Sequence, residues 1–188
     1  LPHFVSWVVV AGIVTKMLST DGGAVNQLLM WLGFIDQPIQ FMAQGNLFWY
    51  IVTGSDIWKE MGWSAIIYLA AISGIDQEQF EAAKVDGASR IRQIWHITLP
   101  SIAPTIAILM IMSIGHLISI GFEKQFLLGN PLVVDYSEVL DLYALNYGLG
   151  MGRFSFGTAI GMFNSIVSII LLLLANGVFK KFTKQSIM

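Results

Sequence analysis

Two groups of residues in this chain have the types and spacing to make specific contacts, and both would act without forming covalent bonds. The first group surrounds a pair of small side chains: Glu81, Lys84 and Asp86 carry charges around Ala82 and Ala83. Alanines leave a low surface on which another backbone can approach closely, and the charges beside them can pair with a partner. This group predicts a docking surface.

The second group consists of polar side chains inside long apolar runs. Ser113 and His116 share one helical face in one run, and Asn164 and Ser168 share a face in another. Polar groups in an apolar layer are costly unless they face a cavity or each other. These four residues are therefore candidates for lining a polar pathway. Bonds between neighbouring helices are the alternative, for His116 and Asn164 in particular.

Two glycines share the face of Asn164 and Ser168. Gly157 and Gly161 precede Asn164 at helical spacing. Small residues along one stripe permit close packing of two helices in a membrane. The glycines therefore predict helix packing rather than a binding site.

The sequence lacks the residues that several kinds of catalysis and binding require. There is no cysteine, the three histidines do not have metal-ligand spacing, and no catalytic constellation is found. The phosphate-binding pattern G-x-x-x-x-G-K-[ST] does not occur, so the chain is not expected to hydrolyse ATP by that route. A net charge of -2 with scattered basic residues argues against nucleic-acid binding.

The docking surface is expected to lie on two short helices joined by a sharp turn. Asp76 can accept the free N–H groups of a first turn, which predicts a helix over residues 77–86. Gly87 suits the left-handed conformation just after a helix end. Ser89 can then begin a second short helix that ends near Trp95.

The composition indicates a membrane protein. Only 12% of the residues are charged and 55% are hydrophobic, whereas soluble domains carry about 25% charged residues. A helix of about 20 apolar residues crosses the hydrocarbon layer. Four runs are long enough, at residues 2–18, 57–75, 101–122 and 158–179. Lys59 and Glu60, near the start of the second run, are placed at the water interface.

The basic residues predict the orientation of these spans. The segment of residues 76–100 and the C-terminal tail fall on one side, and they carry Lys84, Arg90, Arg92, Lys180, Lys181 and Lys184. Lysine and arginine concentrate in cytoplasmic loops, so this side is expected to be cytoplasmic. The loops of residues 19–56 and 123–155 then lie outside, where they either face a partner or cover the end of the helices.

The 76–100 segment resembles the EAA loop of permease subunits of binding-protein-dependent ABC importers. The resemblance rests on Glu81, Ala82 and Ala83, on Gly87 four positions later, and on the closing residues Ile97, Thr98, Leu99 and Pro100. It extends to residues 1–13, 57–76 and 121–133, and so covers essentially the whole chain. These stretches resemble the carbohydrate branch, in particular permeases for oligosaccharides and polysaccharide fragments.

The resemblance implies an all-α fold, a polytopic transmembrane helical bundle with a type I ABC importer permease core. Residues 1–188 would form a single permease domain in the bacterial inner membrane, with the last four of the family's usual six core spans. The residues implied to couple the chain to the ATPases are Glu81, Ala82, Ala83, Asp86, Gly87, Ile97, Leu99 and Pro100.

The implied partners are a second permease subunit, two ATP-binding subunits that hold ATP and Mg, an extracytoplasmic solute-binding protein and the lipid bilayer. No cofactor is expected in this chain. ATP-driven movement of the 76–100 segment would be passed to the next span through an elbow at Pro100 and Pro104 and would drive alternating access. Two alternatives remain, an importer permease for a non-sugar solute and a secondary transporter or channel that needs no ATPase.

Overall fold

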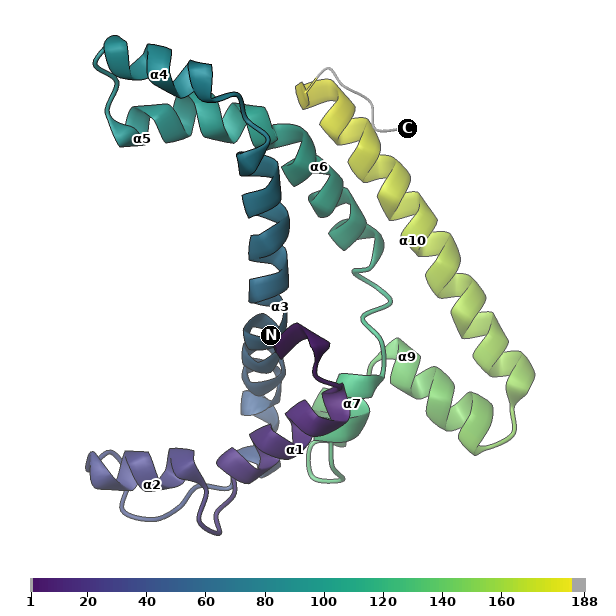
Figure 1. Cartoon of the computed structure of the whole chain (residues 1–188). Coiled ribbons are helices and arrows are strands. Elements are labelled where there is room, and N and C mark those ends of the chain that lie inside the picture. The colour runs from purple at the N-terminus through teal and green to yellow at the C-terminus, as the bar shows by residue number, and fades with distance from the viewer. Residues whose placement is uncertain (1, 184–188) are drawn as a thin grey trace. The chain divides into compact units, whose positions relative to one another are not determined.

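Helices are the only regular structure in residues 2–183, the part of the chain that the computed structural model describes, with side chains described up to Lys180 (Figure 1). This confirms the expected all-α fold. The chain divides into two compact units, Leu1–Gly62 with Ser119–Ser165 and Trp63–Ile118 with Ile166–Met188. Two of its boundaries fall within the longest helices, α3 (Gly45–Ser73) and α10 (Phe154–Thr183), and the third lies between Ile118 and Ser119.

The first unit is built from short helices around the start of α3. Besides the first parts of α3 and α10, its elements are two 3-10 turns (Pro2–Phe4 and Phe41–Ala43), α1 (Trp7–Met17), α2 (Ala24–Trp31), α7 (Glu123–Leu128), α8 (Val134–Ser137), α9 (Leu140–Tyr143) and a π-helical segment (Ala144–Gly150) that continues α9.

The core of the first unit lies where α1, α3 and α7 meet. Its buried members are Ala11, Phe48, Val52, Leu128 and Val133. Each is less than a tenth exposed, and removing such side chains from water is the main source of stability for a packed unit. This core holds α1 against α7 although the two helices are more than 100 residues apart in the chain.

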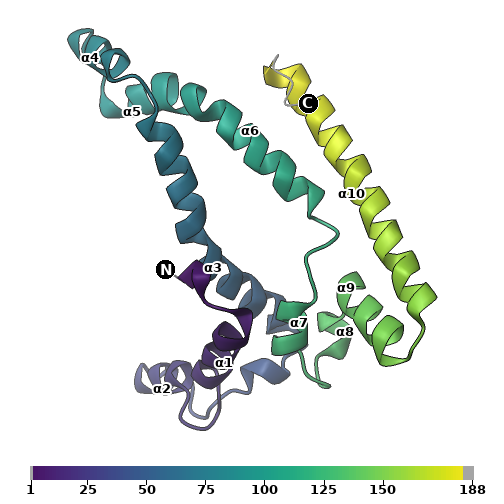
Figure 2. The ribbon, with the colours of Figure 1, turned by 45° about the vertical axis from the view of Figure 1, so that its right-hand side comes forward.

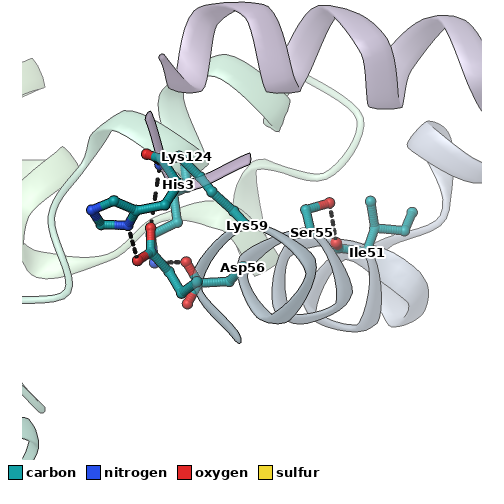
Figure 3. A network of polar contacts seen from close by, with 7 residues as sticks. His3, Ile51, Ser55, Asp56, Lys59 and Lys124 are labelled. Atoms are coloured by element: carbon teal, nitrogen blue, oxygen red, sulfur yellow. Dashed lines mark hydrogen bonds and ion pairs between the residues drawn. The ribbon is translucent and has the colours of Figure 1, made fainter. Parts of the chain in front are cut away.

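A network of charged groups ties the start of the chain to α3 (Figure 3). The Lys59 ammonium is buried, 6% exposed, and donates hydrogen bonds to the His3 carbonyl at 2.5 Å and to the Glu60 carboxylate at 3.2 Å. His3 Nδ1 lies 2.7 Å from Glu60 Oε2, and Lys124 pairs with Asp56 at 2.8 Å. The charge of Lys59 is therefore satisfied inside the unit, and its expected position at the water interface stays a prediction.

The second unit contains the remaining parts of α3 and α10 and the segment between them. Its other elements are α4 (Gln77–Val85), α5 (Arg90–Gln93), a π-helical segment (Ile94–Thr98) and α6 (Leu99–Gly115). Both views show α4 folded back beside α5 (Figures 1 and 2). Within this unit Gly115 is buried against Leu172, whose Cδ1 atom would lie 3.4 Å from a Cβ added to the glycine.

Two of the four expected membrane spans are present as helices long and apolar enough to cross a bilayer, within the described residues. They are Arg90–Gly115 and Phe154–Lys180. The first expected span, residues 2–18, is wrong in length: α1 has 11 residues, which at 1.5 Å per residue span roughly 16 Å, about half of the hydrocarbon layer. Helix α3 has 29 residues and so has the length, but Asp56, Lys59 and Glu60 interrupt its apolar character.

The helix of the third expected span is displaced toward the N-terminus relative to residues 101–122. It begins at Arg90 and ends at Gly115, with His116 capping its end. The chain then passes through Gly121, whose φ of +78° is a left-handed conformation that side chains disfavour, before α7 begins. Residues 116–122 are therefore a connection and not the last turns of a span.

Candidate functional site

The residues expected to form a docking surface lie on α4 and in the turn that follows it. The side chain of Asp76 accepts the Glu78 N–H at 3.0 Å and caps the helix, as its type and position predicted. Glu81, Ala82 and Asp86 are exposed, and Ala83 is half-buried. The pair of small side chains is therefore presented beside two carboxylates at the surface of the second unit.

The turn after α4 is closed by a specific pair of backbone hydrogen bonds. The Ala88 N–H donates to the Ala83 carbonyl at 2.8 Å, and the Gly87 N–H donates to the Lys84 carbonyl at 3.0 Å. This is the Schellman arrangement, which needs a left-handed residue after the helix, and Gly87 has a φ of +72°. The predicted role of Gly87 as the turn residue is confirmed.

Three large apolar side chains are strongly exposed on the helical hairpin that α4, the turn at Gly87 and α5 form. Val85 is 88% exposed, Ile91 70% and Trp95 65%. Large apolar side chains exposed beside charged ones are typical of surfaces that meet another molecule. The sequence alone pointed to the charges and the alanines, and it did not single out these three apolar residues.

The second short helix does not end at Trp95 as expected. Ser89 caps it, accepting the Arg92 N–H at 3.4 Å, but the helix then passes through the π-helical segment into α6 without a break. The Leu99 N–H donates to the Ile94 carbonyl, five residues back, just before Pro100. Proline has no N–H to donate, and its ring crowds the preceding turn, so a wider turn at this position accommodates it.

The remaining coupling candidates lie on this continuous helix. Ile97 and Leu99 are half-buried and Pro100 is exposed, with Pro104 inside α6 one turn further on. The expected elbow therefore coincides with a π-helical turn followed by two prolines, which are recognised causes of helix bending.

The four pathway candidates are divided between the two units. Ser113 and His116, with Ser168, belong to the second unit, and Asn164 belongs to the first. Ser113 is exposed and its hydroxyl donates to the Leu109 carbonyl of its own helix at 2.9 Å. His116 is exposed and follows the last residue of α6, so its expected position inside a helical span is wrong, because the helix ends at Gly115.

Asn164 is the pathway candidate that the structure places in a polar site. It is 5% exposed, and its amide nitrogen donates to Asp141 Oδ1 at 2.9 Å. The other oxygen of Asp141 accepts the Gly121 N–H at 2.8 Å and the Ser119 hydroxyl at 3.3 Å. Asn164 Oδ1 is buried and has no hydrogen-bond partner.

A cleft of about 560 Å³ opens beside this cluster in the first unit. We call it the Asp141 cleft. Its lining residues are Ser119, Gly121, Phe122, Asp141, Ala144, Leu145, Gly148, Leu149, Phe154, Gly157, Thr158, Gly161 and Asn164. Apolar walls with a few polar groups that converge on one place are typical of small-molecule sites.

The glycines beside Asn164 have different environments. A Cβ added to Gly157 would lie 3.1 Å from the Cα of Gly148, so two backbones meet there and the packing role is confirmed. A Cβ added to Gly161 would meet nothing within 4 Å, so packing does not explain that glycine. Gly161 instead leaves open space along the Asp141 cleft.

Sequence reasoning missed Asp141 as a member of the site. Asp141 lies 23 residues before Asn164, in a segment of irregular helix, and no periodic pattern relates the two. The available signal was one acidic residue between Leu140 and Leu142. Only the folding of α9 beside α10 brings the pair together.

Comparison with known proteins places these features in a family. Residues 1–185 match the model of the binding-protein-dependent transport system inner membrane component. The chain is 43% identical over its full length to the polygalacturonan/rhamnogalacturonan transport system permease protein YteP of Bacillus subtilis strain 168, and covers 58% of it. It is 41% identical to Protein LplB of the same organism, again with 58% of that protein covered. The chain thus spans a little under three fifths of the length of these relatives.

The fold is similar to that of solved transporters. A crystal structure of a bacterial alginate ABC transporter in complex with alginate pentasaccharide-bound periplasmic protein superposes with a TM-score of 0.93 at 42% identity, over 100% of this chain and 64% of that one. A second structure, of a bacterial ABC transporter involved in the import of the acidic polysaccharide alginate, gives 0.90 at 41% identity. The chain therefore belongs to the family of binding-protein-dependent transport system inner membrane components.

Proposed function

We propose that this chain is the translocating part of a permease subunit in an ATP-driven importer of oligosaccharides or polysaccharide fragments. The relatives at 43% identity and the similar crystal structures carry names that refer to polygalacturonan, rhamnogalacturonan and alginate. Polysaccharides are thus the solutes named for YteP and for the two solved transporters.

The single observation that carries this proposal is the form of the 76–100 segment. Asp76 and Gly87 define the ends of α4 through local hydrogen bonds, and Ala82 and Ala83 lie between them. Val85, on the last turn of the helix, is almost fully exposed. A rigid, capped helix with exposed apolar and charged side chains fits a groove in a partner, as helix-in-groove recognition requires.

The proposed partners are two ATP-binding subunits, a second permease subunit and an extracytoplasmic solute-binding protein. The ATP-binding subunits hold ATP and Mg, and this chain holds neither. The 76–100 segment and the C-terminus lie in the cytoplasm in this proposal, because the basic residues concentrate there. Of those residues, the side chain of Lys181 and the whole of Lys184 lie outside the described part of the chain.

The proposed mechanism is alternating access without covalent chemistry in this chain. Closure of the ATP-binding subunits displaces α4, and the displacement reaches α6 because α5, the π-helical segment and α6 form one helix from Arg90 to Gly115. In this mechanism the helix bends at Pro100 and Pro104. The shift opens the solute pathway alternately to the outside and to the cytoplasm.

The test is capture of the ATP-binding subunit by variants of the complete permease. Gly87→Val forces a β-branched residue into a left-handed conformation, which deforms the hairpin. We expect it to reduce capture at least tenfold. Gly152→Val is the matched control, because Gly152 has a similar φ of +69°, has equally open surroundings and lies outside the 76–100 segment. Equal capture by the wild type and both variants would contradict the proposal.

A second experiment separates the proposal from a secondary transporter or channel. Residues 1–188 contain no cysteine, so in a permease with no other cysteine a single one at position 84 reports the side of the membrane on which α4 lies. Protection from an impermeant reagent in intact cells, together with uptake that requires ATP, is the expected result. Labelling from the outside, or uptake that continues without ATP, would rule out coupling through this segment.

A further inference from the structure

Helix α2 is held in one position by a single buried side chain. Asn26 is 1% exposed. Its amide nitrogen donates to three backbone carbonyls, those of Ser19 (3.0 Å), Ile39 (3.0 Å) and Leu18 (3.4 Å). Its side-chain oxygen accepts the Ile39 N–H at 2.8 Å. One side chain thus joins the chain before α2 to the chain after it, so the orientation of this short helix is fixed.

The end of α2 is closed in the same way as the end of α4. The Phe34 N–H donates to the Leu29 carbonyl and the Gly33 N–H donates to the Met30 carbonyl, both at 3.0 Å. Gly33 has a φ of +74°, which completes a Schellman arrangement. Phe34 follows directly and is 72% exposed. The segment is therefore a rigid support for the side chains on its outer face.

The face of α2 that points away from Asn26 is apolar and exposed. Leu28 is 55% exposed and Trp31 81%. Residues 22–35 contain no charged side chain, and the exposed residues Asp21 and Asp36 flank them. Large apolar side chains exposed together indicate a surface that meets a membrane or another molecule.

This apolar surface continues from α2 onto its neighbours in the first unit. A groove of about 400 Å³ is lined by Val25 of α2, Met17 of α1, and Tyr50 and Trp58 of α3, among others. Met17 and Trp58 are each 46% exposed, and Tyr50 is 77% exposed. A surface that extends over three helices without a charged residue in the groove suits a continuous apolar medium.

The phospholipid bilayer is the partner that these features favour. The chain belongs to a family of inner membrane components, so a bilayer surrounds the complete protein. Tryptophan concentrates at the boundary between membrane and water because its ring is both apolar and polar. In both views α2 runs across the first part of α3 rather than alongside it, as a helix in the membrane plane does (Figures 1 and 2). Its 8 residues span roughly 12 Å, too short to cross the hydrocarbon layer.

We propose that α2 is an in-plane membrane anchor, with Leu28, Trp31 and Phe34 inserted at the boundary between the lipid headgroups and acyl chains. Asp21 and Asp36 stay in water and limit the depth, because burying a carboxylate is costly. Asn26 fixes the helix in the pose that this contact requires. The inference depends on the membrane family and not on the solute carried. In the proposed orientation the helix lies on the outer leaflet.

The test places a nitroxide spin label on a single cysteine in the complete permease, with any other cysteine removed. The protein is assembled with its partner subunits in nanodiscs of phosphatidylethanolamine and phosphatidylglycerol. Oxygen concentrates in apolar surroundings, whereas the polar complex nickel ethylenediaminediacetate stays in water. Power saturation measures the collision rate of the label with each of them, and the ratio of oxygen to nickel rates reports contact with lipid.

At Trp31→Cys we expect this ratio to be at least about fivefold higher than at Gln37→Cys. Gln37 is the matched control because it is exposed, lies just after the uncharged segment and leaves Asp36 in place. Leu28→Cys reports on the same face of α2 and should also give the high ratio, so it replaces Trp31→Cys if that variant does not assemble.

Two other outcomes would overturn the inference. Free access of nickel to position 31, with a ratio equal to that of the control, would place this face of α2 in water. Low collision rates with both oxygen and nickel, together with an immobilised label, would place it under protein. Repeating the measurement with and without the solute-binding protein shows whether that protein is the one that covers it.

Discussion

The Lys59 ammonium lies 2.5 Å from the backbone carbonyl of His3, 56 residues away in the chain. The same ammonium contacts Glu60, which also binds the His3 ring (Figure 3). One buried cation thus connects the first turn of the described chain to α3. Short α1, which follows His3, is held in place by this bond as well as by its apolar core contacts.

Replacing Lys59 with Met should destabilise the protein by about 2–3 kcal/mol, because the His3 carbonyl and the Glu60 carboxylate both lose a charged donor. The measurement is thermal unfolding of the purified complex in detergent. Lys16→Met is the control, since Lys16 is exposed on α1. Similar midpoints for the two variants would show that the network does not stabilise the unit.

Replacing Asp76 with Ala should weaken binding of the ATP-binding subunit about fivefold. The capping bond to the Glu78 N–H is lost, which costs about 1 kcal/mol and lets the first turn of α4 fray. Asp76→Asn keeps a capping oxygen and should bind nearly as well as the wild type. Binding is measured with purified ATP-binding subunit, and equal losses for both variants would point to the charge rather than the cap.

Replacing Pro104 with Ala should lower the amount of solute moved per ATP hydrolysed. Alanine restores an N–H inside α6 and stiffens the helix that carries the movement of α4. Transport and hydrolysis are measured together in reconstituted vesicles. Pro131→Ala, at an exposed position between α7 and α8, should leave the ratio unchanged, and an unchanged ratio for Pro104→Ala would exclude the elbow.

Replacing Gly157 with Ala should destabilise the first unit by about 1–3 kcal/mol. The added methyl would lie 3.1 Å from the Cα of Gly148, and backbone cannot move aside as a flexible side chain can. Gly177→Ala, on the same helix with nothing within 4 Å, should be neutral or slightly stabilising because alanine favours helix. Thermal unfolding of both variants distinguishes packing from helix propensity.

Prediction from the sequence succeeded for helix caps and turns, whose conformation depends on residues close together in the chain. Asp76, Gly87 and Ser89 occupy the cap and turn positions that their residue types predict. Caps and left-handed turns depend on residues within about five positions of each other, and those residues are visible in the sequence. The caps and the turn of the 76–100 segment could therefore be predicted, and its docking role stays a prediction.

The length of the helices was predicted less well. The helix that was expected to end at Trp95 continues, because a π-helical turn accommodates Pro100 and so removes the expected break. The run at residues 2–18 is apolar enough for a span, yet α1 stops after 11 residues. Apolar composition is the same for a span and for a short helix in a packed core, so composition could not distinguish the two.

The sequence by itself determined the membrane character, the family resemblance and the local form of the 76–100 segment. Only the tertiary structure decided that Lys59 is buried against His3 and that Asp141 meets Asn164 to form the polar side of a cleft. The reason is physical: caps and turns are formed by neighbours in the chain, whereas these two contacts join residues 56 and 23 positions apart. They exist only once α1, α3, α9 and α10 have packed.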